Sequence, residues 1–115
     1  MGIERKMYVS VTGLKAKGIA GLARFAVLAP AAFKEAQNAN GILFCETKTR
    51  AGWHHTLTVW ETKADMMAYR KSPKHLKSMR AFSQIATGKV YGYEAEEKPG
   101  WMAALKAYDA HARDV

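Results

Sequence analysis

The chain is poor in cysteine and has no long apolar run. Its 115 residues contain a single cysteine, Cys45, which leaves no partner for an internal disulfide. The longest apolar stretch, Ala26 to Phe33, is far shorter than the ~20 residues that a membrane-spanning helix needs. The segment Met1–Lys6 carries charges with no apolar stretch behind them, so we expect no secretory signal peptide. Together these absences favour a reducing, cytoplasmic setting and no membrane partner.

Acidic residues are also scarce. There are 10 Asp and Glu against 18 Lys and Arg, and the net charge is +8. A strongly basic protein is a candidate for binding nucleic acid or a phosphorylated ligand. However, the basic residues are scattered, and the denser group from Lys63 to Arg80 comes with no aromatic interleaving and no RNA- or DNA-binding motif. We therefore interpret that group as a solvated basic helix face and do not expect a nucleic-acid partner.

Metal- and nucleotide-binding patterns are missing as well. No spacing among His54, His55, His75 and His111 is typical of a zinc site, and one cysteine supplies no thiolate cluster. The glycines do not form a nucleotide-binding fingerprint. The sequence therefore predicts no metal site of this kind and no phosphate-binding loop.

What is present is the pattern of one globular domain, residues 1–115, with 49% hydrophobic and 24% charged residues. Alternation and β-branched content predict strands, whereas apolar residues at helical spacing predict helices. In chain order we expect a strand at 7–14, a helix at 19–38, strands at 42–48 and 53–60, helices at 62–71 and 73–83, a strand at 89–95 and a helix at 101–111.

Local signals fix several of these boundaries. Thr62 with Asp65 three positions later is a variant of the capping box that begins a helix. Ser72 followed by Pro73 predicts a second N-cap with proline at the first helical position. Pro30 lies inside the helical pattern of 19–38, where it removes a backbone donor, so we expect a kink or a break there.

The order β-α-β-β-α-β plus a C-terminal helix predicts an α+β protein with the ferredoxin-like arrangement. This arrangement is a four-stranded antiparallel sheet with helices on one face. In the strand 53–60, both sets of alternate residues include apolar or aromatic side chains, so neither face of the sheet is cleanly polar. A second copy of the same sheet is the economical cover for the face without helices. We therefore expect a homodimer.

A family resemblance rests on the same segment. It is carried by a strand that ends in Trp and Glu, the helix after it, and a histidine one turn into the next helix: residues 55–61, 67–70 and 72–75. These residues resemble the dimeric α/β-barrel superfamily, and within it small proteins related to spheroidene monooxygenase and the antibiotic-biosynthesis monooxygenases. The resemblance implies a homodimer with a pocket between sheet and helices in each subunit. It implies no single reaction, because members include cofactor-free oxygenases, haem proteins and proteins without known activity.

Six side chains are the candidate site residues. We expect catalysis from two histidines and a carboxylate, and substrate contacts from three aromatic rings: His75, His55 and Glu61, and Trp53, Trp60 and Tyr69, respectively. His75 is also the candidate haem ligand, because imidazole ligates iron and titrates near neutral pH. His54 and His55 are adjacent in a strand and point to opposite faces, so at most one of them lines the pocket. Each candidate also has a purely structural interpretation, such as Trp60 filling the space between sheet and helix.

Two classes of function remain open. The first is a monooxygenase-like enzyme that oxidises a flat hydrophobic small molecule, either without a cofactor or with haem. In the cofactor-free version the deprotonated substrate itself reacts with oxygen. The second is a non-catalytic small-molecule-binding or structural homodimer, in which Trp, Phe and Met side chains fill the same pocket.

Overall fold

The computed structural model describes residues 6–115, so the N-terminal residues that bear on a signal peptide lie outside it. Five strands and four helices follow in an order close to the predicted one. They are β1 (Met7–Ala16), α1 (Gly18–Gln37), β2 (Ile42–Arg50), β3 (Trp53–Trp60), α2 (Lys63–Arg70), α3 (Pro73–Ile85), β4 (Ala86–Ala95), α4 (Trp101–His111) and β5 (Arg113–Asp114). None of the helices in residues 6–115 is long and apolar enough to cross a membrane.

The sheet is antiparallel throughout, with the strand order β2-β3-β1-β4-β5. Its first four members have the order of the ferredoxin-like arrangement, which confirms the predicted α+β fold. The predicted count of four strands is wrong by one, because Arg113 and Asp114 pair with Val90 and Lys89 at the edge of β4. A pair of residues is too short to show an alternating pattern, so β5 has no signal in the sequence.

Strands β2 and β3 form a tight antiparallel hairpin. Arg50 pairs with Trp53, so Ala51 and Gly52 alone form the loop. Both have positive φ, 51° and 81°, as a two-residue loop of the type I′ kind requires. This loop fixes the register of β3, and with it the face to which each β3 side chain points.

The predicted helix caps are confirmed. The backbone N–H of Asp65 donates to the Thr62 hydroxyl at 3.1 Å, and that of His75 donates to the Ser72 hydroxyl at 3.2 Å. We expected a kink or a break at Pro30, and the break is wrong, since α1 is continuous from Gly18 to Gln37. Pro30 and the residue one turn before it are exposed, so water can satisfy the carbonyl that loses its partner.

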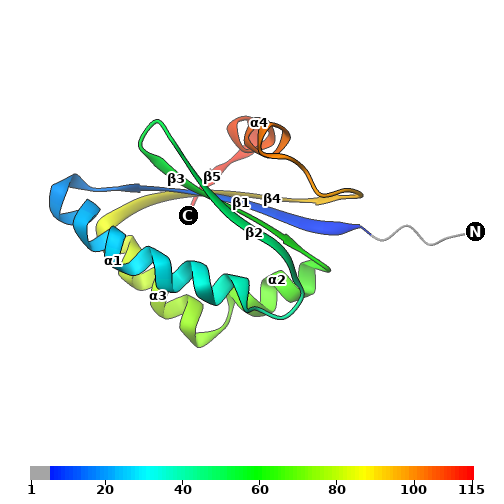
Figure 1. Ribbon diagram of the computed structural model, residues 1–115, viewed down its shortest axis with the longest axis horizontal. Helices are drawn as coiled ribbons and strands as arrows, with labels where there is room; N and C mark the ends of the chain where they lie inside the picture. The colour runs from blue at the N-terminus through cyan, green and yellow to red at the C-terminus, as the bar shows by residue number, and fades with distance from the viewer. Residues whose placement is uncertain (1–5) are drawn as a thin grey trace, which may run out of the picture.

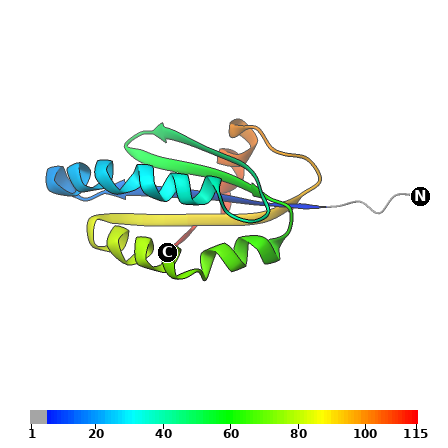
Figure 2. The same cartoon turned by 60° about the horizontal axis from the view of Figure 1, so that its bottom comes forward.

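The helices lie on both faces of the sheet (Figure 1). Helices α1, α2 and α3 cover one face and α4 crosses the other, an arrangement that the turned view also shows (Figure 2). We expected the second face to need a second copy of the chain, but α4 already covers part of it. Four sheet residues pack against Ala104, Leu105 and Tyr108 of α4 and are at most 1% exposed within the single chain: Val9, Val11, Leu57 and Val59.

The opposite face of the same strands is different in character. Five of the residues of β1 and β3 that alternate with this apolar set carry hydroxyl groups, and they face the layer of α1, α2 and α3: Tyr8, Ser10, Thr12, Thr56 and Thr58. The helices above them are held together by a separate apolar cluster of Phe25, Phe82, Ile85 and Ala86. The apolar core is thus on the α4 side, and a polar sheet surface is left beneath the three-helix layer.

Candidate functional site

A cavity of about 680 Å³ lies between the sheet and helices α1, α2 and α3. The resemblance predicted a pocket in this position. Its sheet wall carries the five hydroxyl groups of Tyr8, Ser10, Thr12, Thr56 and Thr58. Its helix wall is apolar and comes mainly from α1 and α3: Phe25, Ala29, Ala32, Phe33, Ala36, Met79 and Phe82. The volume is that of a small-molecule site, and the two unlike walls suit a flat molecule that is apolar on one face.

The sheet wall is partly committed to internal hydrogen bonds. The indole Nε1–H of Trp60 donates to the Thr58 hydroxyl at 2.9 Å, and that hydroxyl donates to the backbone carbonyl of Ser10 at 3.3 Å. Trp60 is 1% exposed, so this chain of bonds holds a buried ring at one end of the cavity. The hydroxyls of Ser10, Thr12 and Thr56 have no hydrogen-bond partner within residues 6–115, which leaves them available to a ligand.

Three of the predicted site residues are together in this cavity. The Tyr69 ring lies between Trp60 and His75, with centroid distances of 5.2 Å and 4.7 Å. Burial raises the pKa of Tyr69 to about 12, so its hydroxyl stays protonated and can donate a hydrogen bond at neutral pH. Burial also lowers the pKa of His75, and the Glu35 carboxylate opposes that shift only in part. His75 is therefore a neutral imidazole at pH 7, able to accept a proton.

The other three predicted residues lie elsewhere. His55 points to the α4 face, where its ring meets the edge of Tyr108 at 5.0 Å, although it also borders the large cavity. Trp53 lies beside a second, smaller cavity on that face. Glu61 is exposed beyond the end of β3 and does not line either cavity. Its backbone N–H donates to the Gly41 carbonyl at 2.8 Å.

His54 is the β3 histidine that enters the large cavity. Its ring stacks on Phe25 at 4.5 Å, and its Nδ1 lies 3.2 Å from the Thr49 hydroxyl. Because side chains alternate along a strand, His54 of β3 lies on the same face as Trp60. The hydroxyl wall had the same kind of signal, because Ser10 and Thr12 on β1 alternate with valines. What sequence alone could not show is that this face lies under the helices.

The cavity is lined by cations and by no Asp or Glu side chain of residues 6–115. Five basic side chains contribute to its walls and rim: Lys48, Lys63, Arg70, Lys89 and Arg113. A concave site with one sign of side-chain charge favours the anionic form of a bound molecule and lowers the pKa of an acidic group on it. This placement accounts for part of the net charge of +8. Among residues 6–115 no group of three His, Cys, Asp or Glu side chains could hold a metal ion.

A scan against protein-family models finds no match, and a search of curated proteins finds none either. Solved structures do match. SnoaB, a cofactor-independent oxygenase from Streptomyces nogalater, aligns with a TM-score of 0.69 and 12% identity over 81% of this chain and 96% of its own. Two proteins described as candidate antibiotic biosynthesis monooxygenases also align. That of Nitrosomonas europaea has a TM-score of 0.71 and 14% identity, covering 87% of this chain and 100% of its own. That of Deinococcus radiodurans has a TM-score of 0.69 and 16% identity, covering 80% and 96%.

These likenesses define the class of fold. The chain has the ferredoxin-like α+β fold of the antibiotic-biosynthesis-monooxygenase-like proteins, as the resemblance in residues 55–75 predicted. At 12–16% identity the match concerns the fold, and the reaction has to be argued from the site itself.

Proposed function

We propose that this protein is a cofactor-independent monooxygenase acting on a flat aromatic carbon acid that carries hydroxyl or carbonyl groups. The observation that carries the proposal is the large cavity with its two unlike walls. The apolar α1 and α3 side chains suit one face of an aromatic ring system, and the free Ser10, Thr12 and Thr56 hydroxyls suit its oxygen substituents. The cationic rim suits the anion that such a carbon acid forms.

The first step in this proposal is proton removal. The neutral imidazole of His75 takes a proton from a C–H bond that lies between aromatic rings and is conjugated to a carbonyl. Lys63 and Arg70, which also line the cavity, stabilise the negative charge that develops on the substrate oxygen. The protonated Tyr69 hydroxyl can donate a hydrogen bond to that oxygen.

Molecular oxygen is the oxidant in the second step. The carbanion transfers one electron to O₂, and the substrate radical and superoxide combine to form a C–O bond. The resulting peroxide takes the proton from the His75 imidazolium. Loss of water then converts the original CH₂ group into a carbonyl, so that each O₂ leaves one oxygen atom in the product and one in water. The apolar helix wall limits water access to the radical pair.

The resemblance also implies a second version of the reaction, one that uses haem. The residues fit haem in part, since His75 would ligate the iron and Lys63 and Arg70 would pair with the propionates. When bound, haem would supply an iron atom for oxygen activation. We favour the cofactor-free reaction because a neutral His75 together with a cationic cavity is what proton removal from a carbon acid needs.

Anthrone is a suitable probe, because it is flat, forms a stabilised carbanion and gives anthraquinone on oxidation. Oxygen uptake and anthraquinone absorbance should both exceed the uncatalysed rate in buffer containing a metal chelator. His75→Phe keeps a ring but removes the base, so the catalysed rate should fall by about 10²–10⁴-fold. Glu61→Gln is the matched control and should leave the rate unchanged, because Glu61 is exposed and outside the cavity.

The same experiment separates the alternatives. Tight binding of anthrone with no rate above background would support the non-catalytic small-molecule-binding function. Turnover that appears only after haemin is added, together with a Soret band, would support the haem-dependent reaction. Neither binding nor turnover would contradict the proposal for this class of substrate.

A further inference from the structure

We propose that a second, smaller cavity on the α4 face binds a small oxyanion that carries an O–H group. This site lies on the α4 side of the sheet. It shares His55 and Lys89 with the lining of the large cavity, but it does not depend on the oxygenase proposal. Its volume is about 200 Å³. It is bordered by the hairpin end of β2 and β3, by β4 and by the C-terminal part of α4: Arg50, Trp53, His55, Lys89, Tyr108, Asp109 and Ala112.

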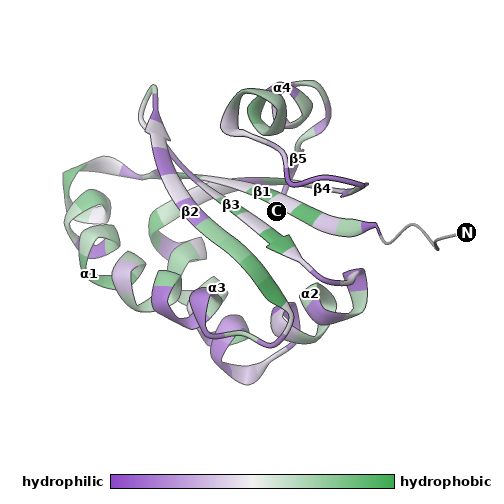
Figure 3. Ribbon diagram, turned by 45° about the vertical axis from the view of Figure 1, so that its right-hand side comes forward, coloured by the Kyte–Doolittle hydropathy of each residue, from purple (hydrophilic) through white to green (hydrophobic). Residues whose placement is uncertain are grey.

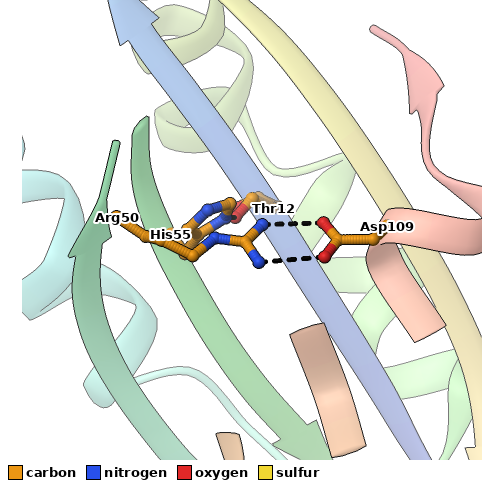
Figure 4. Close-up of polar contacts among 4 residues, drawn as sticks. All are labelled: Thr12, Arg50, His55 and Asp109. Carbon is orange, nitrogen blue, oxygen red and sulfur yellow. Dashed lines mark hydrogen bonds and ion pairs between the residues drawn. The ribbon is translucent and has the colours of Figure 1, made fainter. Parts of the chain in front are cut away.

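The observation that points to a ligand is the His55 side chain. It is 1% exposed, and its Nδ1 lies 3.2 Å from the backbone carbonyl oxygen of Thr12 (Figure 4). A carbonyl oxygen can only accept, so Nδ1 carries the proton and donates it. Nε2 of the neutral ring is then an acceptor, and it is buried without a partner among residues 6–115. Buried polar atoms are nearly always paired, so a donor from outside residues 6–115 is the missing group.

The charges around this cavity select an anion. Arg50 Nη1 and Nη2 donate to the two Asp109 carboxylate oxygens at 2.9 Å and 2.7 Å, and this is the one ion pair within the described part of the chain. Three of the five guanidinium N–H groups stay free. Lys89 has no carboxylate partner there, and its Nζ lies 5.7 Å from the centre of the Trp53 ring. Two cations and one carboxylate leave an excess positive charge.

The side chains that line this cavity are held in position by an ion pair and by close packing. Figure 3 shows that β2 is hydrophobic at the end near α2 and hydrophilic toward the hairpin, where Arg50 lies. Arg50 reaches across to Asp109 on α4, beside the His55 ring (Figure 4). Gly13 beneath it leaves room for the Tyr108 hydroxyl, and a Cβ there would also lie 3.1 Å from His55 Cε1. Only a glycine allows both rings to pack against β1 at this point.

The ligand therefore has to satisfy two demands at once. It donates one hydrogen bond to the buried Nε2 of His55, and it presents a negative charge to Lys89 and the free N–H groups of Arg50. Two common chemistries meet both demands in a small volume, namely a hydrogen phosphate group and a 2-hydroxy carboxylate. Sulfate and acetate match them in charge or size but have no O–H group at pH 7.

Nitrogen chemical shifts of the histidine rings test this directly in the unmodified protein. In protein labelled with ¹⁵N-histidine at pH 7.5, the free form should show His55 Nε2 as an unprotonated ring nitrogen. Inorganic phosphate, glycolate or both should shift that signal saturably at millimolar concentrations, and the responding probe distinguishes the two chemistries. The matched sulfate or acetate should bind about tenfold more weakly, the factor expected for one hydrogen bond.

A charge variant supplies the second test. Lys89→Met should weaken phosphate or glycolate binding several-fold, whereas Lys106→Met removes the same charge from α4 outside both cavities and should leave binding unchanged. The proposal is overturned if none of the four probes moves the His55 Nε2 signal. It is equally overturned if sulfate and acetate bind as tightly as phosphate and glycolate, or if the two lysine variants behave alike.

Discussion

Gly13 is the residue at which a single added methyl group should test the packing of α4 on the sheet. Gly13 is buried in β1, opposite His55, and the Tyr108 hydroxyl occupies the space where a Cβ would lie. The Cβ of Gly13→Ala would also come within 3.1 Å of His55 Cε1. Neither ring can move freely, because Tyr108 is 5% exposed and His55 is 1% exposed.

The expected cost follows from this crowding. Overpacking a buried site by one methyl group costs about 1–3 kcal/mol. For a domain of about this size, each kcal/mol lowers the melting temperature by about 4 °C, so Gly13→Ala should melt about 4–12 °C below the wild type. Gly100→Ala is the control. No atom lies within 4 Å of the new methyl group, so the only cost is that of a weaker α4 N-cap, at most about 1 kcal/mol.

A double variant makes the test specific to α4. Tyr108→Phe removes the hydroxyl that the new methyl group at position 13 meets, so Gly13→Ala combined with Tyr108→Phe should cost less than the two single changes added together. Thermal unfolding followed by circular dichroism gives all four stabilities. If Gly13→Ala melts with the wild type, or if the two changes are simply additive, α4 does not pack on the sheet as described.

Three further predictions concern charge, reactivity and assembly. Burial lowers the pKa of both His55 and His75 in the folded protein. Below pH 6.5, the ordinary pKa of histidine, the unfolded chain therefore binds more protons than the folded one. Their contribution to stability is complete above pH 6.5 and is lost as the pH falls through the lowered values, so the urea midpoint should decrease between pH 7 and pH 5; a flat profile would contradict this. Burial raises the pKa of Cys45 to about 11, so its reaction with a thiol reagent at pH 7.5 should be much slower than that of free cysteine, and equal rates would contradict its burial. We still propose a homodimer, because β2 is an edge strand on which Leu43 is 50% exposed; light scattering should give about twice 12.8 kDa, and a monomer mass at micromolar concentration would refute it.

Most of the fold was predictable because its signals are local. Thr62 and Ser72 cap helices through contacts three residues away, and alternation identified the main strands. The side of the sheet that α4 covers was not predictable. The spacing of Trp101, Leu105 and Tyr108 predicts an apolar helix face, but it does not say which face of a distant sheet that face meets. The start of β4 at Ala86, before the predicted start at Lys89, was not predictable either, because it depends on pairing with Ala16 in the distant strand β1.

Like the fold, the candidate site was predictable only where its signals are local. Trp60, Tyr69 and His75 come from one short stretch whose strand-to-helix junction brings them together, and the structure places all three in the large cavity. For the adjacent pair His54 and His55, alternation shows only that they point in opposite directions. Which histidine lies under the helices depends on which face of the whole sheet the helices cover. In the structure it is His54, whose ring stacks on Phe25 of α1.

The proposed function requires a flat aromatic molecule to bind between the hydroxyl-bearing sheet and the apolar walls of α1 and α3. This binding can be followed in a methyl spectrum of protein labelled at alanine and methionine, titrated with an anthraquinone sulfonate as an unreactive anionic product analogue. Saturable shifts at the methyl groups of Ala32, Ala36 and Met79, with Ala104 on the buried face of α4 unmoved, are the expected result. No shifts at the three cavity methyl groups, or shifts confined to Ala104, would show that the ring system does not bind there.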